Sequence, residues 1–289
     1  MLKLQGIFPP IATPFDHNGE IYKTKVRHNV EKWNMVKLAG YLVCGSTGEG
    51  VHLTTEEKVT LWGLVAEANA PGRLLLAGTG AESVRETVAL TNKAAEVGYQ
   101  AAVVRTPHYY KPDQELYFRA VADQAKIPVI IDNIPRLTGV DIAAESVAKL
   151  SEHPNIIAIK ESSGILGKTK WMLREVKKGF QVLVGAAPAM WPSLDVGAAG
   201  AVVAFANAAP YACITIWEAH RTREREAALD WQNRIAHPAE LVTVKYGIPG
   251  LKYAMDLNGY YGGPCRLPLA PLNPDAKAEL EQAFDGIRG

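Results

Sequence analysis

Short apolar runs rich in β-branched residues alternate with longer amphipathic stretches along most of the chain, and this alternation constrains the fold more than any other feature. Strand-like runs lie at 6–12, 40–44, 73–78, 101–106, 128–132, 156–160, 181–185 and 201–205. Helical patterns lie between them, among them 55–69, 83–97, 115–124, 142–150 and 167–176. Short strands that are apolar on both faces and separated by helices are typical of parallel sheets.

Eight such units predict an α/β fold, a (β/α)8 TIM barrel that comprises residues 1–207. After the eighth run only helical patterns follow, at 210–235, 242–257 and 274–284. They predict a C-terminal helical extension, residues 208–289, packed on the barrel and available as an oligomer contact.

Composition and patterning exclude several classes of partner. The 31 Lys and Arg residues balance 30 Asp and Glu residues without a dense basic cluster, so we expect neither a nucleic acid nor a membrane partner. The longest uncharged run, between Asp195 and Glu218, contains Gly, Asn and Pro and does not predict a membrane span. The N-terminus lacks a secretory pattern, and three widely spaced cysteines predict no disulfide framework, so we expect a cytoplasmic protein.

Motifs for metals and nucleotides are not found. The seven histidines form none of the paired spacings that hold zinc. The string Gly78-Thr79-Gly80 lacks the remainder of a dinucleotide or phosphate-loop fingerprint. We therefore expect no metal and no cofactor.

Catalytic residues of an eight-stranded barrel lie where its strands end. Lys160 ends the sixth apolar run. In an apolar site desolvation disfavours the ammonium form of a lysine, and the neutral amine attacks carbonyl groups. Position alone leaves two interpretations open: a Schiff-base lysine, or a lysine that pairs with Glu161 or reaches solvent.

The loop that follows the second run, GSTGE at 45–49, combines glycines with two hydroxyl residues. Backbone N–H groups together with the hydroxyls of Ser46 and Thr47 can hold a carboxylate. An ordinary turn between a strand and a helix has the same composition, so this loop alone does not decide.

Four strings occur in order: GSTGE at 45–49, TPHYY at 106–110, DNIPRLTG at 132–139 and HPNIIAIKESSG at 153–164. With them the chain resembles the dihydrodipicolinate synthase and N-acetylneuraminate lyase family over nearly its whole length. Within that family, residues 247–272 and 73–83 look most like the 4-hydroxy-2-oxoglutarate aldolases.

The resemblance implies a homotetramer or dimer whose Lys160 forms a Schiff base with pyruvate or another 2-oxo acid. Ser46 and Thr47 match the hydroxyl pair that binds the substrate carboxylate, and Ser46 relays a proton. Tyr109 matches a tyrosine that reaches into a neighbouring subunit's site. Substrate-binding positions near the imine are matched by Gly45, Gly185 and Val202.

Two positions depart from the family pattern. Asp132 stands where the family has a tyrosine as general acid and base. Either Asp132 takes over proton transfer, or the barrel binds a 2-oxo acid without turning it over. A structural ion pair between Arg105 and Asp132 is a third alternative. Leu137 stands where relatives that bind a second carboxylate often carry arginine, and Arg136 is one residue early.

The preferred reaction is therefore cleavage of 4-hydroxy-2-oxoglutarate to pyruvate and glyoxylate, with Lys160, Asp132, Ser46 and Tyr109 as catalytic residues. The alternative is dihydrodipicolinate synthase, which condenses pyruvate with aspartate semialdehyde. An alternative of another class is a catalytically silenced barrel that binds a 2-oxo acid metabolite.

Overall fold

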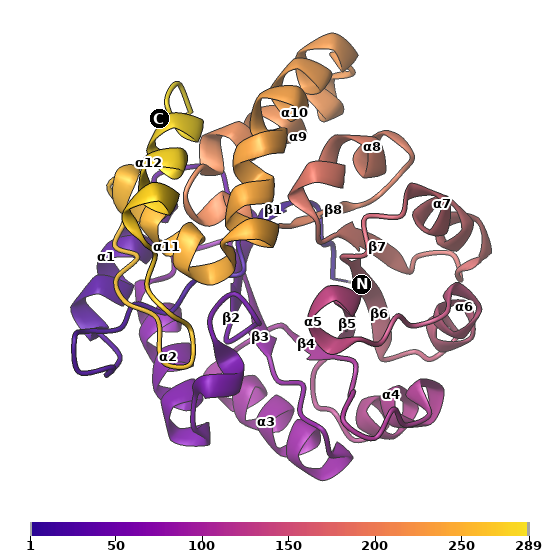
Figure 1. The fold of residues 1–289 in the computed structure, drawn as a ribbon. Helices are drawn as coiled ribbons and strands as arrows, with labels where there is room; N and C mark the ends of the chain where they lie inside the picture. Colours follow the sequence, from indigo (N-terminus) through magenta and orange to yellow (C-terminus); the bar gives the residue numbers. More distant parts are fainter. Residues whose placement is uncertain (1, 288–289) are drawn as a thin grey trace.

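Eight parallel strands form one sheet that curls into a barrel (Figure 1). The computed structural model describes residues 2–287. Its strands are β1 (Gly6–Phe8), β2 (Gly40–Val43), β3 (Leu74–Gly78), β4 (Ala101–Arg105), β5 (Val129–Asn133), β6 (Ile156–Glu161), β7 (Gln181–Val184) and β8 (Gly200–Val202).

The order of the strands follows the chain around the barrel, with β1 paired to β8. Leu42 closes the remaining gap: its N–H donates to the carbonyl of Pro9 at 3.0 Å, and its carbonyl accepts from the N–H of Ile11 at 2.8 Å. The expected (β/α)8 barrel is confirmed. The first strand ends earlier than expected because Pro9 and Pro10 carry no N–H to continue the ladder.

Helices surround the barrel as the amphipathic patterns predict. They are α1 (Lys23–Asn34), α2 (Thr55–Ala68), α3 (Val84–Val97), α4 (Gln114–Ala122), α6 (Ala144–Ser151), α7 (Leu166–Glu175) and α8 (Met190–Asp195). One further turn of helix, α5 (Pro135–Thr138), and the 3-10 helices η1 (Gly50–His52), η2 (Ala187–Ala189) and η3 (Ala204–Asn207) follow the ends of strands. η3 takes the place of the expected C-terminal half of the eighth strand.

The C-terminal part is helical, as expected, but its first helix is broken in two. α9 (Pro210–Thr222) ends at Arg223, whose φ of 66° is left-handed, and α10 (Arg225–Glu240) folds back against α9. A π-helix, η4 (Leu241–Lys245), leads into α11 (Gly247–Leu257), and α12 (Pro274–Ala283) follows. Figure 1 shows α10, α11 and α12 in orange and yellow along one side of the barrel. The division at residue 207 stays a prediction.

No helix within residues 2–287 combines the length and the apolar character that crossing a membrane requires. Side chains alternate between the two faces of each strand, so every second residue points into the barrel. The barrel interior is filled by apolar residues that include Phe8, Leu42, Leu76, Val103, Ile130, Ala158, Leu183 and Val202.

On the four strands β3 to β6 the next inward position, two residues further along, is still part of the strand: Gly78, Arg105, Asp132 and Lys160. Past the end of β2 the alternation breaks, because Cys44 has a left-handed φ of 62° and its Sγ atom faces the carbonyl of Lys58 on α2. The three charged side chains lie on the adjacent strands β4, β5 and β6. They form one charged arc at this end of the barrel.

Candidate active site

Asp132 lies between two cations across the sheet. Arg105 and Asp132 are paired in register between β4 and β5, and Asp132 and Lys160 are paired between β5 and β6. The Nζ atom of Lys160 lies 2.9 Å from Oδ1 of Asp132, and the two side chains are only 8% and 4% exposed. Because a charge is costly to bury without a partner, the two groups depend on each other.

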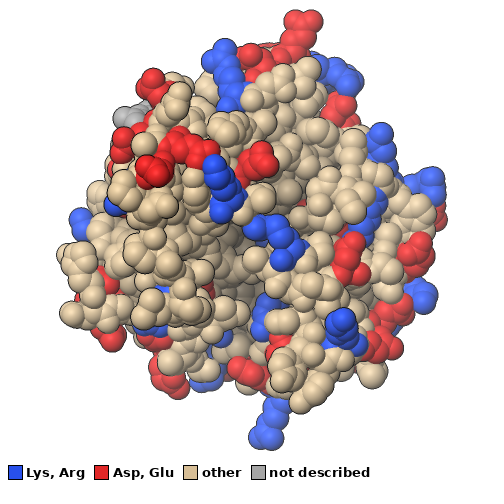
Figure 2. All heavy atoms as spheres, in the orientation of Figure 1, with Lys and Arg blue, Asp and Glu red and all other residues tan. Residues whose placement is uncertain are grey.

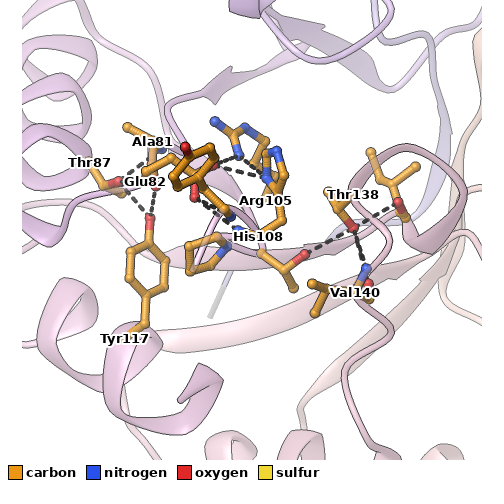
Figure 3. Close-up of polar contacts among 12 residues, drawn as sticks. Ala81, Glu82, Thr87, Arg105, His108, Tyr117, Thr138 and Val140 are labelled. Atoms are coloured by element: carbon orange, nitrogen blue, oxygen red, sulfur yellow. Dashed lines mark hydrogen bonds and ion pairs between the residues drawn. The ribbon is translucent and has the colours of Figure 1, made fainter. Parts of the chain in front are cut away.

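The alternative ion pair between Arg105 and Asp132 is wrong. Arg105 Nη1 lies 2.7 Å from Glu82 Oε1 and 3.0 Å from His108 Nδ1 instead. Figure 3 shows Arg105 and His108 directed at Glu82, which follows β3. The backbone N–H groups of His108 and Tyr109 donate to the same carboxylate at 2.9 and 3.0 Å.

These donors explain the titration of Glu82. Burial disfavours its charged form, but the hydrogen bonds from Arg105 and from the N–H groups of Tyr109 and His108 outweigh burial and lower the pKa of Glu82 to about 2. Glu82 is therefore a fixed anion. Glu82 neutralises the charge of Arg105, so Asp132 forms its ion pair with Lys160.

The loop that carries Ser46 and Thr47 is a tight turn. The N–H groups of Gly48 and Gly50 both donate to the carbonyl of Gly45 at 3.1 Å. Within residues 2–287, no hydrogen bond engages the backbone N–H or the hydroxyl of Ser46 or Thr47. These donors are available to an anionic ligand such as a carboxylate.

A buried ion pair anchors this loop to the C-terminal extension. Glu49, with a left-handed φ of 54°, lies 2.7 Å from Nζ of Lys252 on α11, and the side chains are 0% and 1% exposed. The backbone N–H of Arg266 donates to the other oxygen of Glu49 at 2.9 Å. The sequence analysis missed this pair. A lysine between apolar residues of α11, in the string Gly250-Leu251-Lys252-Tyr253-Ala254, is the signal that could have revealed it.

A cavity of about 750 Å³ opens beside Lys160; we call it the larger cavity. It collects five of the predicted site residues, which come from four different strand ends: Ser46, Thr47, Lys160, Gly185 and Val202. Figure 2 shows a hollow near the middle of the face drawn in Figure 1. Residues that follow different strands meet here because all parallel strands end on the same side of the barrel.

Gly185 and Ser162 shape the wall next to Lys160. A Cβ atom at Gly185 would lie 2.0 Å from Oγ of Ser162 and 3.1 Å from Cε of Lys160, so only glycine leaves room there. The Oγ atom of Ser162 is buried and has no hydrogen-bond partner within residues 2–287. A buried hydroxyl without a partner is uncommon and is available to a bound molecule. The sequence analysis missed Ser162.

Asp132 does not line the larger cavity but borders a second space, the smaller cavity, of about 260 Å³. Gly45 and Ser46 line this space, and Ser46 borders both cavities. Tyr109 lies away from both: its side chain is 75% exposed and packs edge-on against Tyr110, with ring centroids 4.9 Å apart. The chain by itself therefore does not bring Tyr109 to Lys160.

Within residues 2–287 no group of three or more His, Cys, Asp or Glu side chains is placed to hold a metal ion. What the site offers is one lysine with one carboxylate, free hydroxyl and N–H donors, and a cavity of the volume that small-molecule ligands occupy.

The chain was compared with known proteins. The model of the dihydrodipicolinate synthetase family matches residues 3–286. Relatives named 4-hydroxy-tetrahydrodipicolinate synthase, from Methanothrix thermoacetophila and an Exiguobacterium species, are 34% and 32% identical; the alignments cover 97% of this chain and 96% and 97% of the relatives. Dihydrodipicolinate synthase from Bacillus anthracis superposes with a TM-score of 0.94 at 28% identity over 99% of both chains.

These names support the alternative, dihydrodipicolinate synthase, better than the preferred 4-hydroxy-2-oxoglutarate aldolase, a similarity that the comparisons do not show. The family model matches almost the whole chain, and the matched residues include Lys160, Asp132 and the GSTGE loop. The chain belongs to the dihydrodipicolinate synthetase family and is a lyase of the aldolase type.

Proposed function

We propose that the protein joins or cleaves carbon–carbon bonds through a Schiff base between Lys160 and a 2-oxo acid, with pyruvate as the first candidate. One observation carries this proposal: Lys160, paired with the buried Asp132, borders the same cavity as the unengaged donors of Ser46 and Thr47. The donors suit the carboxylate of a 2-oxo acid, and the lysine suits its carbonyl.

The reaction begins with transfer of a proton from the ammonium of Lys160 to Asp132. The neutral amine attacks C2 of pyruvate to give a neutral carbinolamine, whose hydroxyl group takes the proton back from Asp132 and leaves as water, which gives a protonated imine. A base removes a proton from C3, and the electron pair of that C–H bond moves toward the iminium nitrogen to give an enamine. No cofactor is required because the imine itself accepts the electrons.

The enamine then attacks an aldehyde. A bond forms between C3 and the aldehyde carbon, and the aldehyde oxygen takes a proton and becomes a hydroxyl group. Water hydrolyses the imine, which releases a 4-hydroxy-2-oxo acid and restores Lys160. Cleavage is the same sequence in reverse. Asp132 is the acid and base, with Ser46 and Tyr109 as proton relays, Tyr109 from a second copy of the chain.

The names of the relatives make aspartate semialdehyde the reference acceptor, which corresponds to the dihydrodipicolinate synthase reaction. The chemistry at Lys160 is the same for every aldehyde. The residues that line the cavity beyond Lys160 therefore determine which aldehyde the enzyme accepts.

The test is borohydride reduction in the presence of pyruvate, followed by intact and peptide mass analysis. We expect one reduced adduct, confined to the peptide that contains Lys160, and none in Lys160→Met. A folded protein that forms no adduct would support the silenced barrel, in which Asp132 holds the lysine as an unreactive ammonium.

A further inference from the structure

We propose that the acceptor aldehyde of this enzyme carries an apolar alkyl or aryl side chain, a proposal that rests on the imine chemistry above. The evidence is the part of the larger cavity that lies beyond Lys160, here called the acceptor half. Its walls come from α5 and the residue before it, from η4, from α11 and from Leu269.

Apolar side chains dominate these walls. The acceptor half is lined by Ile134, Pro135, Leu137, Val242, Val244, Ile248, Pro249, Leu251 and Leu269. Leu137 and Val244 are 56% and 52% exposed, although both are large apolar residues. They flank the point where α5 touches η4, where the guanidinium of Arg136 donates to the carbonyl of Thr243. An apolar ligand would cover side chains that now face water.

The polar side chains of the acceptor half already have partners. The hydroxyl of Thr243 donates to the carbonyl of Ala239 at 2.6 Å, and the hydroxyl of Tyr246 donates to Glu279. Arg136 is held on Thr243. No Asp or Glu is among the described residues that line the cavity. A substrate ammonium would find no anion here, and among the described residues that line this half the one cation, Arg136, would have to leave Thr243 to bind a second carboxylate.

The two substrates then occupy different parts of the larger cavity. Pyruvate occupies the part of the larger cavity that is lined by Lys160 and Gly185, with its carboxylate on Ser46 and Thr47. The aldehyde enters from the acceptor half, its side chain packs toward Leu137 and Val244, and its carbonyl carbon meets C3 of the enamine. The product is a 4-hydroxy-2-oxo acid with an apolar substituent at C4.

The experiment compares acceptors at saturating pyruvate, with benzaldehyde and hexanal as apolar probes and aspartate semialdehyde and glyoxylate as anionic probes. Product is measured by chromatography and mass spectrometry. We expect kcat/KM for an apolar probe to exceed the values for both anionic probes by about tenfold or more. We expect Leu137→Arg to lower that value by about tenfold while borohydride trapping of pyruvate on Lys160 proceeds as in the parent.

Leu229→Arg is the matched control, because Leu229 lies on α10 away from the cavity and is similarly exposed, at 49%. This control shows whether an added arginine disturbs the protein in general. Arg136→Met tests the competing interpretation, an anionic acceptor, since it removes the one cation among the described residues that line the acceptor half.

Two results overturn the inference alone. An enzyme that uses aspartate semialdehyde or glyoxylate in preference to both apolar probes, and loses that activity in Arg136→Met, binds an anionic acceptor. If Leu137→Arg and Leu229→Arg lower kcat/KM for the apolar probe equally, Leu137 does not determine the choice of acceptor. Absence of the pyruvate adduct overturns the proposed function together with this inference, whereas an adduct with anionic preference overturns the inference alone.

Discussion

At the scale of single residues, Asp132 has two neighbouring cations in register and pairs with only one. A third group determines its partner. Glu82 Oε1 lies 2.7 Å from Arg105 Nη1 and neutralises that charge, so the carboxylate of Asp132 pairs with Lys160, whose Nζ atom lies 2.9 Å from Oδ1. A carboxylate this close to the reacting nitrogen is within reach for direct proton transfer. We therefore expect Asp132 to act as the general acid and base, although its side chain is shorter than that of a tyrosine.

Asp132→Asn tests that role. The amide keeps the shape but cannot take a proton, so we expect the exchange of the pyruvate methyl protons with deuterium, followed by NMR, to slow by about 10²- to 10⁴-fold. Asp123→Asn, at an exposed position outside both cavities, is the control. Faster exchange in Asp132→Asn would instead mean that Asp132 silences the lysine.

Glu82→Gln tests the fixed anion. Because the pKa of Glu82 is lowered from its ordinary value of 4.5 to about 2, the ionised carboxylate stabilises the fold fully above pH 4.5, and this stabilisation is lost as the pH falls toward 2. We expect Glu82→Gln to lower the urea midpoint at pH 7 and the difference from the parent to narrow at pH 3. A difference that stays constant with pH would contradict an electrostatic role.

At the scale of elements, the loop that offers Ser46 and Thr47 is held from outside the barrel. Glu49 at the end of this loop and Lys252 on α11 form a pair that is essentially buried. Lys252 also donates to the carbonyl of Pro264 at 2.8 Å. The C-terminal extension thus fixes the loop that carries Ser46 and Thr47 as well as forming one wall of the larger cavity.

Lys252→Met removes one partner and leaves the carboxylate of Glu49 buried without its cation. We expect the free energy of unfolding, measured in urea, to fall by about 3–5 kcal/mol. Lys126→Met breaks an exposed pair with Glu96 and should change the same quantity by about 1 kcal/mol or less. Glu49→Gln combined with Lys252→Met should recover part of the loss; equal effects of Lys252→Met and Lys126→Met would contradict the anchor.

The barrel itself could be predicted because each apolar run is a strand buried on both faces, and the order of strands follows from the order of runs. The strand and helix ends could not, since they depend on local chemistry such as Pro9 and Pro10 and on the packing that turns the chain at Arg223. The approximate ends of the apolar runs were nevertheless sufficient to identify Lys160 and Gly185 as candidate site residues. The partner of Arg105 and the wall made by η4 depend on contacts between distant segments, which periodicity does not report.

At the scale of the whole molecule, Tyr109 and Tyr110 stand out from the surface. Their side chains are 75% and 86% exposed, and the backbone of Tyr109 is held by Glu82. Large rigid aromatic side chains on an anchored loop are typical of protein–protein contacts. The smaller cavity beside Asp132 is large enough to admit a side chain from a second copy of the chain. We therefore expect a homo-oligomer, a tetramer or a dimer, by sedimentation velocity.

Subunit mixing tests whether Tyr109 acts across that contact. We expect Tyr109→Phe to slow deuterium exchange into pyruvate by about 100-fold while the oligomer persists, because only the hydroxyl is lost. Tyr110→Phe is the matched control. Lys160→Met is inactive for a different reason. In a mixed oligomer, a Lys160→Met subunit supplies Tyr109 to the site of a Tyr109→Phe subunit, which retains Lys160. Exchange activity should therefore return on mixing and reassembly, whereas a tyrosine that serves its own chain would leave every mixed site defective.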